Sequence, residues 1–126
     1  MILDSIKSHI QAAGVAGGET GWGLFTGFLP DTPDKSVAIF ELPGGEPETL
    51  SENETLSRVE FQVRVRGAER DYQSARTKIQ EIFDILHNQP VSGFIYVFAI
   101  QSGPMPLGND RQDRPNLTQN YKTSEV

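Results

Sequence analysis

The stretch RVEFQVRVRGAERDYQSARTKIQEIFDILHN, residues 58–88, decides the fold of this chain. Its first part alternates apolar and polar side chains, which is the two-residue period of a half-buried strand. The apolar positions are Val59, Phe61, Val63 and Val65. After Gly67 the apolar residues recur at steps of three and four, which predicts a helix with one apolar stripe. The sequence therefore predicts a strand followed by a helix that lies on the apolar face of that strand.

The predicted helix over residues 71–87 carries a signal at each end. Asp71 has a short carboxylate side chain, which can accept hydrogen bonds from the first free backbone N–H groups of a helix. Asn88 and Pro90 follow the last apolar position, and both residue types commonly end helices. We therefore expect this helix to begin near residue 71 and to end near residue 87.

Toward the N-terminus, the sequence predicts one helix and two strands. We expect the helix over the first thirteen residues, ended by Gly14, because its apolar positions recur at helical spacing: Ile2, Leu3, Ile6, Ile10 and Ala13. Strand signals follow at residues 22–30 and 36–42, with turn-forming residues between them. Residues 43–57 are polar and acidic with few large apolar side chains, so we expect an exposed loop there.

Toward the C-terminus, the seven apolar residues 94–100 predict a central strand covered on both faces. The helix over residues 72–86 can cover one face, and the N-terminal helix or a neighbouring subunit would have to cover the other. The turn-rich segment 102–115 is long for a connection without structure, so we expect it to be functional or ordered by a partner. Residues 116–123 alternate and predict a last, edge strand.

These elements predict a small α+β protein with a single domain over residues 1–126. We expect a mixed or antiparallel sheet of four to five strands, with the N-terminal helix and the second helix, about 71–87, packed on it. The formal net charge of −6 argues against a broad phosphate-binding surface. Charged residues interrupt the first thirteen positions, so we expect no signal peptide there and no membrane span elsewhere.

The sequence predicts no catalytic, cofactor-binding or metal site. Cysteine is absent, and His9 and His87 have no spacing that makes a metal pair. Asp110 and Asp113 lack the surrounding pattern of an EF-hand calcium loop. The acidic residues of segment 43–57 lack the apolar surroundings that separate the pKa values of two catalytic carboxylates.

Arg64 and Arg66 lie two residues apart on the polar side of the predicted strand, so they project together. They belong either to a solvated sheet face or to a contact with a neighbour. In the second case their guanidinium groups would pair with carboxylates of the neighbour's acidic segment.

The order of these segments resembles the tail terminator or minor capsid proteins of long-tailed bacteriophages. The similarity rests on FLPDTPDKSVAIFELPGGEP, then on VRVRG with the helix that closes in Leu86-His87, then on PMPLGNDRQDRPNLTQNYK. It covers nearly the whole chain. Proteins of this kind form a ring, commonly of six copies, on the last ring of the tail tube.

The resemblance implies a structural, non-enzymatic virion protein at the head–tail junction, assembled in the host cytoplasm. Such a ring stops tube polymerisation and offers a docking surface to the head. The implied partners are further copies of the chain, the tail-tube protein and a head-completion or neck protein, while DNA passes through the lumen without specific binding. No cofactor and no membrane are implied.

We expect the interface to involve Arg64 and Arg66 and the segment 104–114. The residues chosen within that segment are Pro104, Met105, Leu107, Asp110, Arg111 and Arg114. Alternative functions are a head-completion or connector protein, another minor capsid protein, or a small α+β hydrolase, although no convergent acid, base and nucleophile can be named for a hydrolase.

Overall fold

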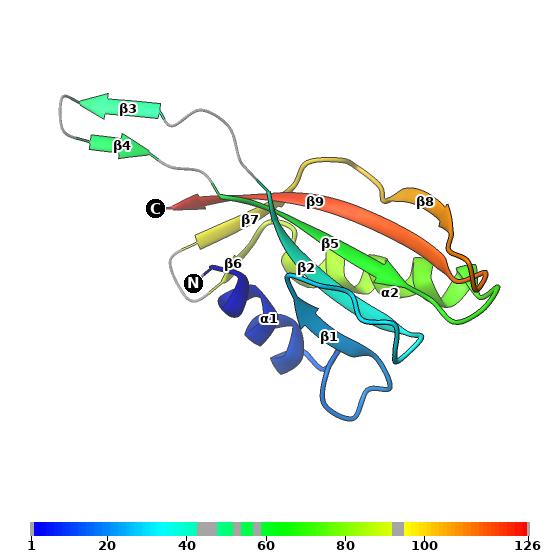
Figure 1. Ribbon diagram of the computed structural model, residues 1–126. Coiled ribbons are helices and arrows are strands. Elements are labelled where there is room, and N and C mark those ends of the chain that lie inside the picture. The colour runs from blue at the N-terminus through cyan, green and yellow to red at the C-terminus, as the bar shows by residue number, and fades with distance from the viewer. Residues whose placement is uncertain (1, 43–47, 52–53, 57–58, 92–94, 126) are drawn as a thin grey trace.

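Two helices cover one side of a curved sheet in the computed structural model (Figure 1). The structure describes residues 2–42, 48–51, 54–56, 59–91 and 95–125. The helices are α1 (Ile2–Ala12) and α2 (Tyr72–Leu86). The strands are β1 (Gly23–Thr26), β2 (Ser36–Leu42), β3 (Glu48–Ser51), β4 (Glu54–Leu56), β5 (Glu60–Arg66), β6 (Gln89–Val91), β7 (Ile95–Ala99), β8 (Met105–Asn109) and β9 (Pro115–Glu125).

The main sheet has seven strands in the order β1-β2-β5-β9-β7-β6, with β8 paired beside β7 on the same edge of β9. β1 and β2 are parallel, and the other pairs are antiparallel. β3 and β4 form a separate two-stranded sheet. Figure 1 shows this hairpin standing beyond the end of the main sheet.

The strand and helix predicted from residues 58–88 are confirmed as β5 and α2. Asp71 caps α2 by accepting a hydrogen bond from the backbone N–H of Ser74, at 3.1 Å. Asn88 lies just past the helix in the left-handed region, at φ 58°. Gly67 joins the two elements, and a Cβ there would lie 2.7 Å from the Asp71 carbonyl oxygen. Glycine is therefore required at this junction.

The buried apolar residues form one cluster between the sheet and the two helices. β5 contributes Phe61, Val63 and Val65, and the Phe61 ring stacks on Tyr121 of β9 at 5.2 Å. α2 contributes the buried residues Ala75, Ile79, Ile82 and Leu86. The imidazole Nε2–H of His9 in α1 donates to the Ile85 carbonyl oxygen at 2.9 Å and so ties the two helices together.

The predicted number of strands was too low. The prediction of four to five strands missed β6 and β8, and it treated residues 43–57 as a loop although they contain β3 and β4. β8 carries Pro106 and Gly108, two residue types that are rare inside strands. Residues 43–47, 52–53 and 57–58 lie outside the described part of the chain.

The predictions for two further strands were wrong in part or in full. The apolar run gives β7, which lies inside the sheet between β9 and β6 as predicted, but its two faces are not both covered within the subunit, because Tyr96 is 42% exposed. The last strand, β9, is not an edge strand, because β5 pairs along one side of it and β7 and β8 along the other. Its buried Gln119 is satisfied by the Gln101 carbonyl oxygen at 2.8 Å, so a polar residue occupies a core position.

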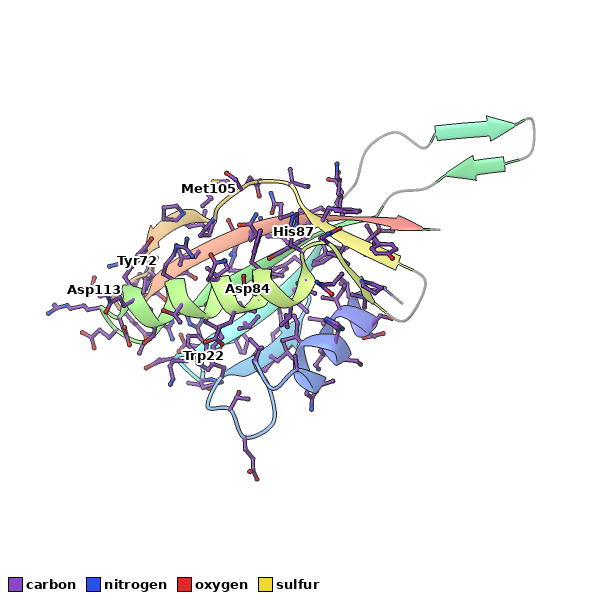
Figure 2. The ribbon with its side chains drawn as sticks, turned by 180° about the vertical axis from the view of Figure 1, so that it is seen from behind. Trp22, Tyr72, Asp84, His87, Met105 and Asp113 are labelled. Carbon is purple, nitrogen blue, oxygen red and sulfur yellow. The ribbon has the colours of Figure 1, made fainter. Side chains whose placement is uncertain are left out.

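Both helices pack on the same face of the main sheet, as Figure 2 shows from the helix side. Of the two covers expected for the second face of β7, α1 is therefore excluded, and cover by a neighbouring subunit stays a prediction. We call the opposite surface the helix-free face. Its side chains alternate with those of the core, so Gln62 and Arg64 of β5 and Asn120 and Lys122 of β9 lie on it.

Replacing Ile82 by Ala should lower the free energy of unfolding by about 2–5 kcal/mol, because this side chain is fully buried in the core. Denaturant titration measures the change. Phe98→Ala should cost less, since Phe98 is only half-buried. Gln80→Ala on the exposed side of α2 should stay within about 0.5 kcal/mol of the wild type. Equal losses for Ile82→Ala and Gln80→Ala would contradict this description of the core.

Candidate assembly interface

The helix-free face combines polar residues at its centre with aromatic residues toward both sides. The Gln62 side-chain amide donates to the Asn120 side-chain oxygen at 3.0 Å, which links β5 to β9. The Arg64 guanidinium lies over the Phe40 ring at 5.3 Å, and its Nη2 reaches the Gln62 side-chain oxygen only at 3.5 Å. The Arg64 Nε is buried and has no hydrogen-bond partner among the described residues.

Arg66, predicted to project together with Arg64, is only 4% exposed. The connection between the parallel strands β1 and β2 covers it. Its Nε donates to the Asp34 carbonyl oxygen at 2.9 Å and its Nη2 to the Pro33 carbonyl oxygen at 2.7 Å. An interface role for Arg66 stays a prediction, while the structure shows its guanidinium holding residues 33–36 of its own subunit.

Arg114 is also 4% exposed and joins two segments that lie about 80 residues apart in the sequence. Its Nε donates to Asp110 Oδ2 at 2.8 Å, within the turn that connects β8 to β9. Its Nη1 donates to the Asp31 carbonyl oxygen at 2.7 Å and to Asp34 Oδ1 at 3.1 Å, and its Nη2 donates to Asp31 Oδ1 at 2.9 Å. We call Arg114 with its three aspartates the Arg114 cluster.

Burial and hydrogen bonds oppose each other in the Arg114 cluster. Burial disfavours the charged form of Asp110, but the backbone N–H groups of Arg114 and Gln112 and the Arg114 guanidinium outweigh it, so the pKa of Asp110 is lowered. Burial likewise disfavours charged Arg114, yet its hydrogen bonds to the aspartates raise the pKa of Arg114. Burial, followed by repulsion from Arg114, lowers the pKa of Arg66. The cluster is thus held together by charges in direct contact.

The remaining predicted interface residues lie on or beside β8. Met105 and Leu107 expose 48% and 49% of their side chains, and all five residues of β8 are exposed. Pro104 precedes the strand and is half-buried, and Arg111 is exposed in the turn after it. Arg111 also lines a surface hollow of about 240 Å³ beside the Arg114 cluster. Whether these residues contact a neighbour stays a prediction.

Trp22 belongs to a site that the sequence did not indicate. The ring is buried, and the ammonium groups of Lys35 and Lys78 lie 5.4 and 5.3 Å from its centre. The Lys78 ammonium also donates to the Val15 carbonyl oxygen and to Glu81. The three residues come from distant parts of the chain, so only the folded structure brings them together. Figure 2 labels Trp22 beside α2.

Both histidines have contacts within the fold. His9 bridges the helices, and His87 stacks on Phe83 at 4.8 Å and accepts a hydrogen bond from the Ala99 N–H through Nδ1 at 3.0 Å. Within the described ranges, no group of three or more histidine or acidic side chains is arranged to hold a metal ion. In the same ranges, neither helix is long and apolar enough to cross a membrane.

The comparison with known families decides the class of this protein. A family described as bacteriophage tail terminator protein matches residues 9–125. The chain belongs to this family. The resemblance recognised from the sequence is therefore confirmed, and the protein is a structural component of the virion. No curated protein matches the sequence of this tail terminator family member.

The fold of this tail terminator family member also occurs in a solved structure. A chain from the virion of a native gene transfer agent particle matches it with a TM-score of 0.67 and 10% sequence identity. The match covers 95% of this chain and 90% of that chain. At such low identity the comparison shows a common fold, which independently supports the arrangement of helices and strands described above.

Acid should weaken the fold partly through Asp110. Because the folded-state pKa of Asp110 is lowered, its stabilising contribution is complete well above the usual Asp pKa of about 3.9 and is lost as the pH falls through the folded-state value. Asp110→Asn should therefore differ most from the wild type in unfolding free energy at neutral pH, and the difference should shrink below about pH 4.

Denaturant titrations from pH 7 to pH 3 measure this difference. The control Glu69→Gln removes an exposed acid outside the Arg114 cluster and should follow the wild-type pH profile. If the loss of stability in Asp110→Asn were the same at every pH, the carboxylate would not be the stabilising group.

Proposed function

We propose that this protein is the ring-forming tail terminator of a long-tailed phage or phage-like particle. The ring, hexameric in our proposal, binds the last ring of the tail tube. It stops tube polymerisation and provides the docking surface for the head. The observation that carries this proposal is the family match over residues 9–125.

The two ends of the main sheet support the ring. Among the described strands, β1 forms one edge, and β6 and β8 form the other. Edge strands carry backbone N–H and C=O groups that can pair with another chain. A contact between two unlike edges is head-to-tail, and such contacts close into a ring when the rotation between copies allows it. The exposed Met105 and Leu107 on β8 add apolar surface to one of these edges.

The charge of the chain is compatible with the passage of DNA through the lumen. The formal net charge is −6, and a protein must place several cations against phosphates to bind DNA strongly. In this proposal the partners are further copies of the chain, the tail-tube protein and a head-completion or neck protein. Segment 104–114 and Arg64 contribute to the contacts between copies or with these partners.

A second candidate is a head-completion or connector protein of the same particle. Exposed β8 supports this candidate equally well, because an open sheet edge can receive any partner strand. The two candidates differ in what they bind: a terminator binds the growing end of the tail tube, whereas a connector binds the head.

Purified protein should shorten tail tubes when it is added to polymerising tail-tube subunits. Electron microscopy of the products measures tube length, and an extra ring should appear at one end of the capped tubes. The matched control is the same reaction with heat-unfolded protein. Tubes of unchanged length with no end ring, in the presence of folded protein, would exclude the terminator function and favour the connector.

A further inference from the structure

The β3–β4 hairpin has no partner surface within the described part of its own subunit. β3 and β4 pair only with each other. Figures 1 and 2, which view the molecule from opposite sides, both show the hairpin beyond the end of the main sheet. A two-stranded hairpin alone is only marginally stable in water, so this one gains stability when it packs on another surface.

The sequence of the hairpin segment is acidic. Residues 43–57 contain glutamates but no lysine or arginine, and both β3 and β4 begin with a glutamate: Glu48 and Glu54. Each strand also contains one leucine, Leu50 or Leu56. A surface that receives this hairpin should therefore offer cations together with some apolar area.

The helix-free face offers such a surface around Arg64. The cross-strand neighbours of Arg64 are Ala38 and Thr118, which carry no charge. Its guanidinium is half-buried, and its Nε has no partner among the described residues. A guanidinium removed from water is stabilised most by a carboxylate, which accepts charge-assisted hydrogen bonds. Within the described part of the fold, no acidic side chain makes an ion pair with Arg64.

The surroundings of Arg64 supply the apolar area and a second cation. Phe40 lies beneath the guanidinium, and Tyr96 and Phe98 stack with each other at 6.4 Å on the β7 side of the face. Lys122 is exposed on β9 and adds a second positive charge. Glu60 of β5 lies opposite Lys122 in the strand pairing and can balance its charge, whereas the uncharged Thr118 lies opposite Arg64. Arg64 is therefore the stronger binding group for a carboxylate from another copy.

The hairpin lies beyond the end of the main sheet of its own subunit (Figures 1 and 2). It leaves the body where β2 ends and β5 begins, and both views place it beyond the sheet and not over it. In this position the hairpin can meet a neighbouring copy without first separating from the sheet of its own subunit.

We propose that the β3–β4 hairpin of one copy binds the helix-free face of the next copy and pairs its glutamates with Arg64. This inference rests on the proposed assembly of several copies. The contact is heterologous, because the hairpin and the sheet face are different surfaces of the same chain. Every copy then both donates a hairpin and receives one.

Cross-linking tests whether the contact joins two chains. The natural sequence has no cysteine, so single cysteines introduced at chosen positions are the only thiols. Thr55→Cys places one on β4, and Gln62→Cys places the other on the helix-free face, two residues before Arg64. One of the two variants carries a mass tag, so a disulfide between unlike chains is recognised by its mass.

The two cysteine variants are mixed and oxidised, both in solution and with tail tubes. We expect a linked pair of unlike chains in at least one of the two conditions. The control pairs Thr55→Cys with Gln80→Cys, which lies on the exposed side of α2 on the opposite side of the molecule. No linked pair in either condition, or as much of it with Gln80→Cys, would overturn the proposal.

Charge exchange tests the role of Arg64. Arg64→Glu and the double change Glu48→Arg with Glu54→Arg should each weaken assembly at least about tenfold. A mixture of the two variants should restore it, because a reversed hairpin then meets a reversed face. Analytical ultracentrifugation measures assembly, and circular dichroism checks that each variant is folded.

Two outcomes would overturn the role of Arg64. One is assembly unchanged in either variant. The other is restoration only when all three changes are in one chain, which would place the contact within a subunit. Tube capping by the wild-type protein is measured in parallel. If capping occurs without the hairpin contact, the contact is rejected and the terminator function is retained. If the hairpin contact forms without capping, the terminator function is rejected and the contact is retained.

Discussion

The pairing of β9 with three other strands is the interaction on which the rest of the sheet depends. β5 runs along one side of β9, and β8 and β7 follow each other along the other side. Strands from the middle and the end of the sequence are therefore held by the last strand of the chain. Contacts between distant parts of a sequence form slowly in folding, so the sheet becomes complete only when this C-terminal strand is in place.

The sequence was sufficient where a pattern is local. The alternation of β5, the three- and four-residue spacing of α2 and the capping by Asp71 all depend on neighbours within a few residues, and all were predicted correctly. β2 was also predicted with its observed limits. The order of strands was not predictable in the same way. β9 looks like an edge strand because it contains Gln119 and Asn120, yet it pairs with β5, β7 and β8.

The interface itself stays a prediction, and the sequence did not indicate how its residues are held in the fold. Segment 104–114 was expected to face a partner, and the structure places Met105 and Leu107 on an exposed strand there. Arg66 and Arg114 were expected at the surface, as isolated arginines in a sequence normally are. Their burial depends on oxygens of residues 31–34, which no local pattern connects to them. Trp22 and its two lysines were missed for the same reason.

The Arg114 cluster has a consequence for how tightly this protein can bind a partner. It ties the connection between β1 and β2 to the turn after β8, so two surface segments that would otherwise move separately are fixed together. Ordering a loop during association costs free energy, which reduces affinity. Here that ordering is already complete within the free subunit, so a partner that binds beside β8 meets a pre-formed surface and keeps more of its interaction energy as affinity.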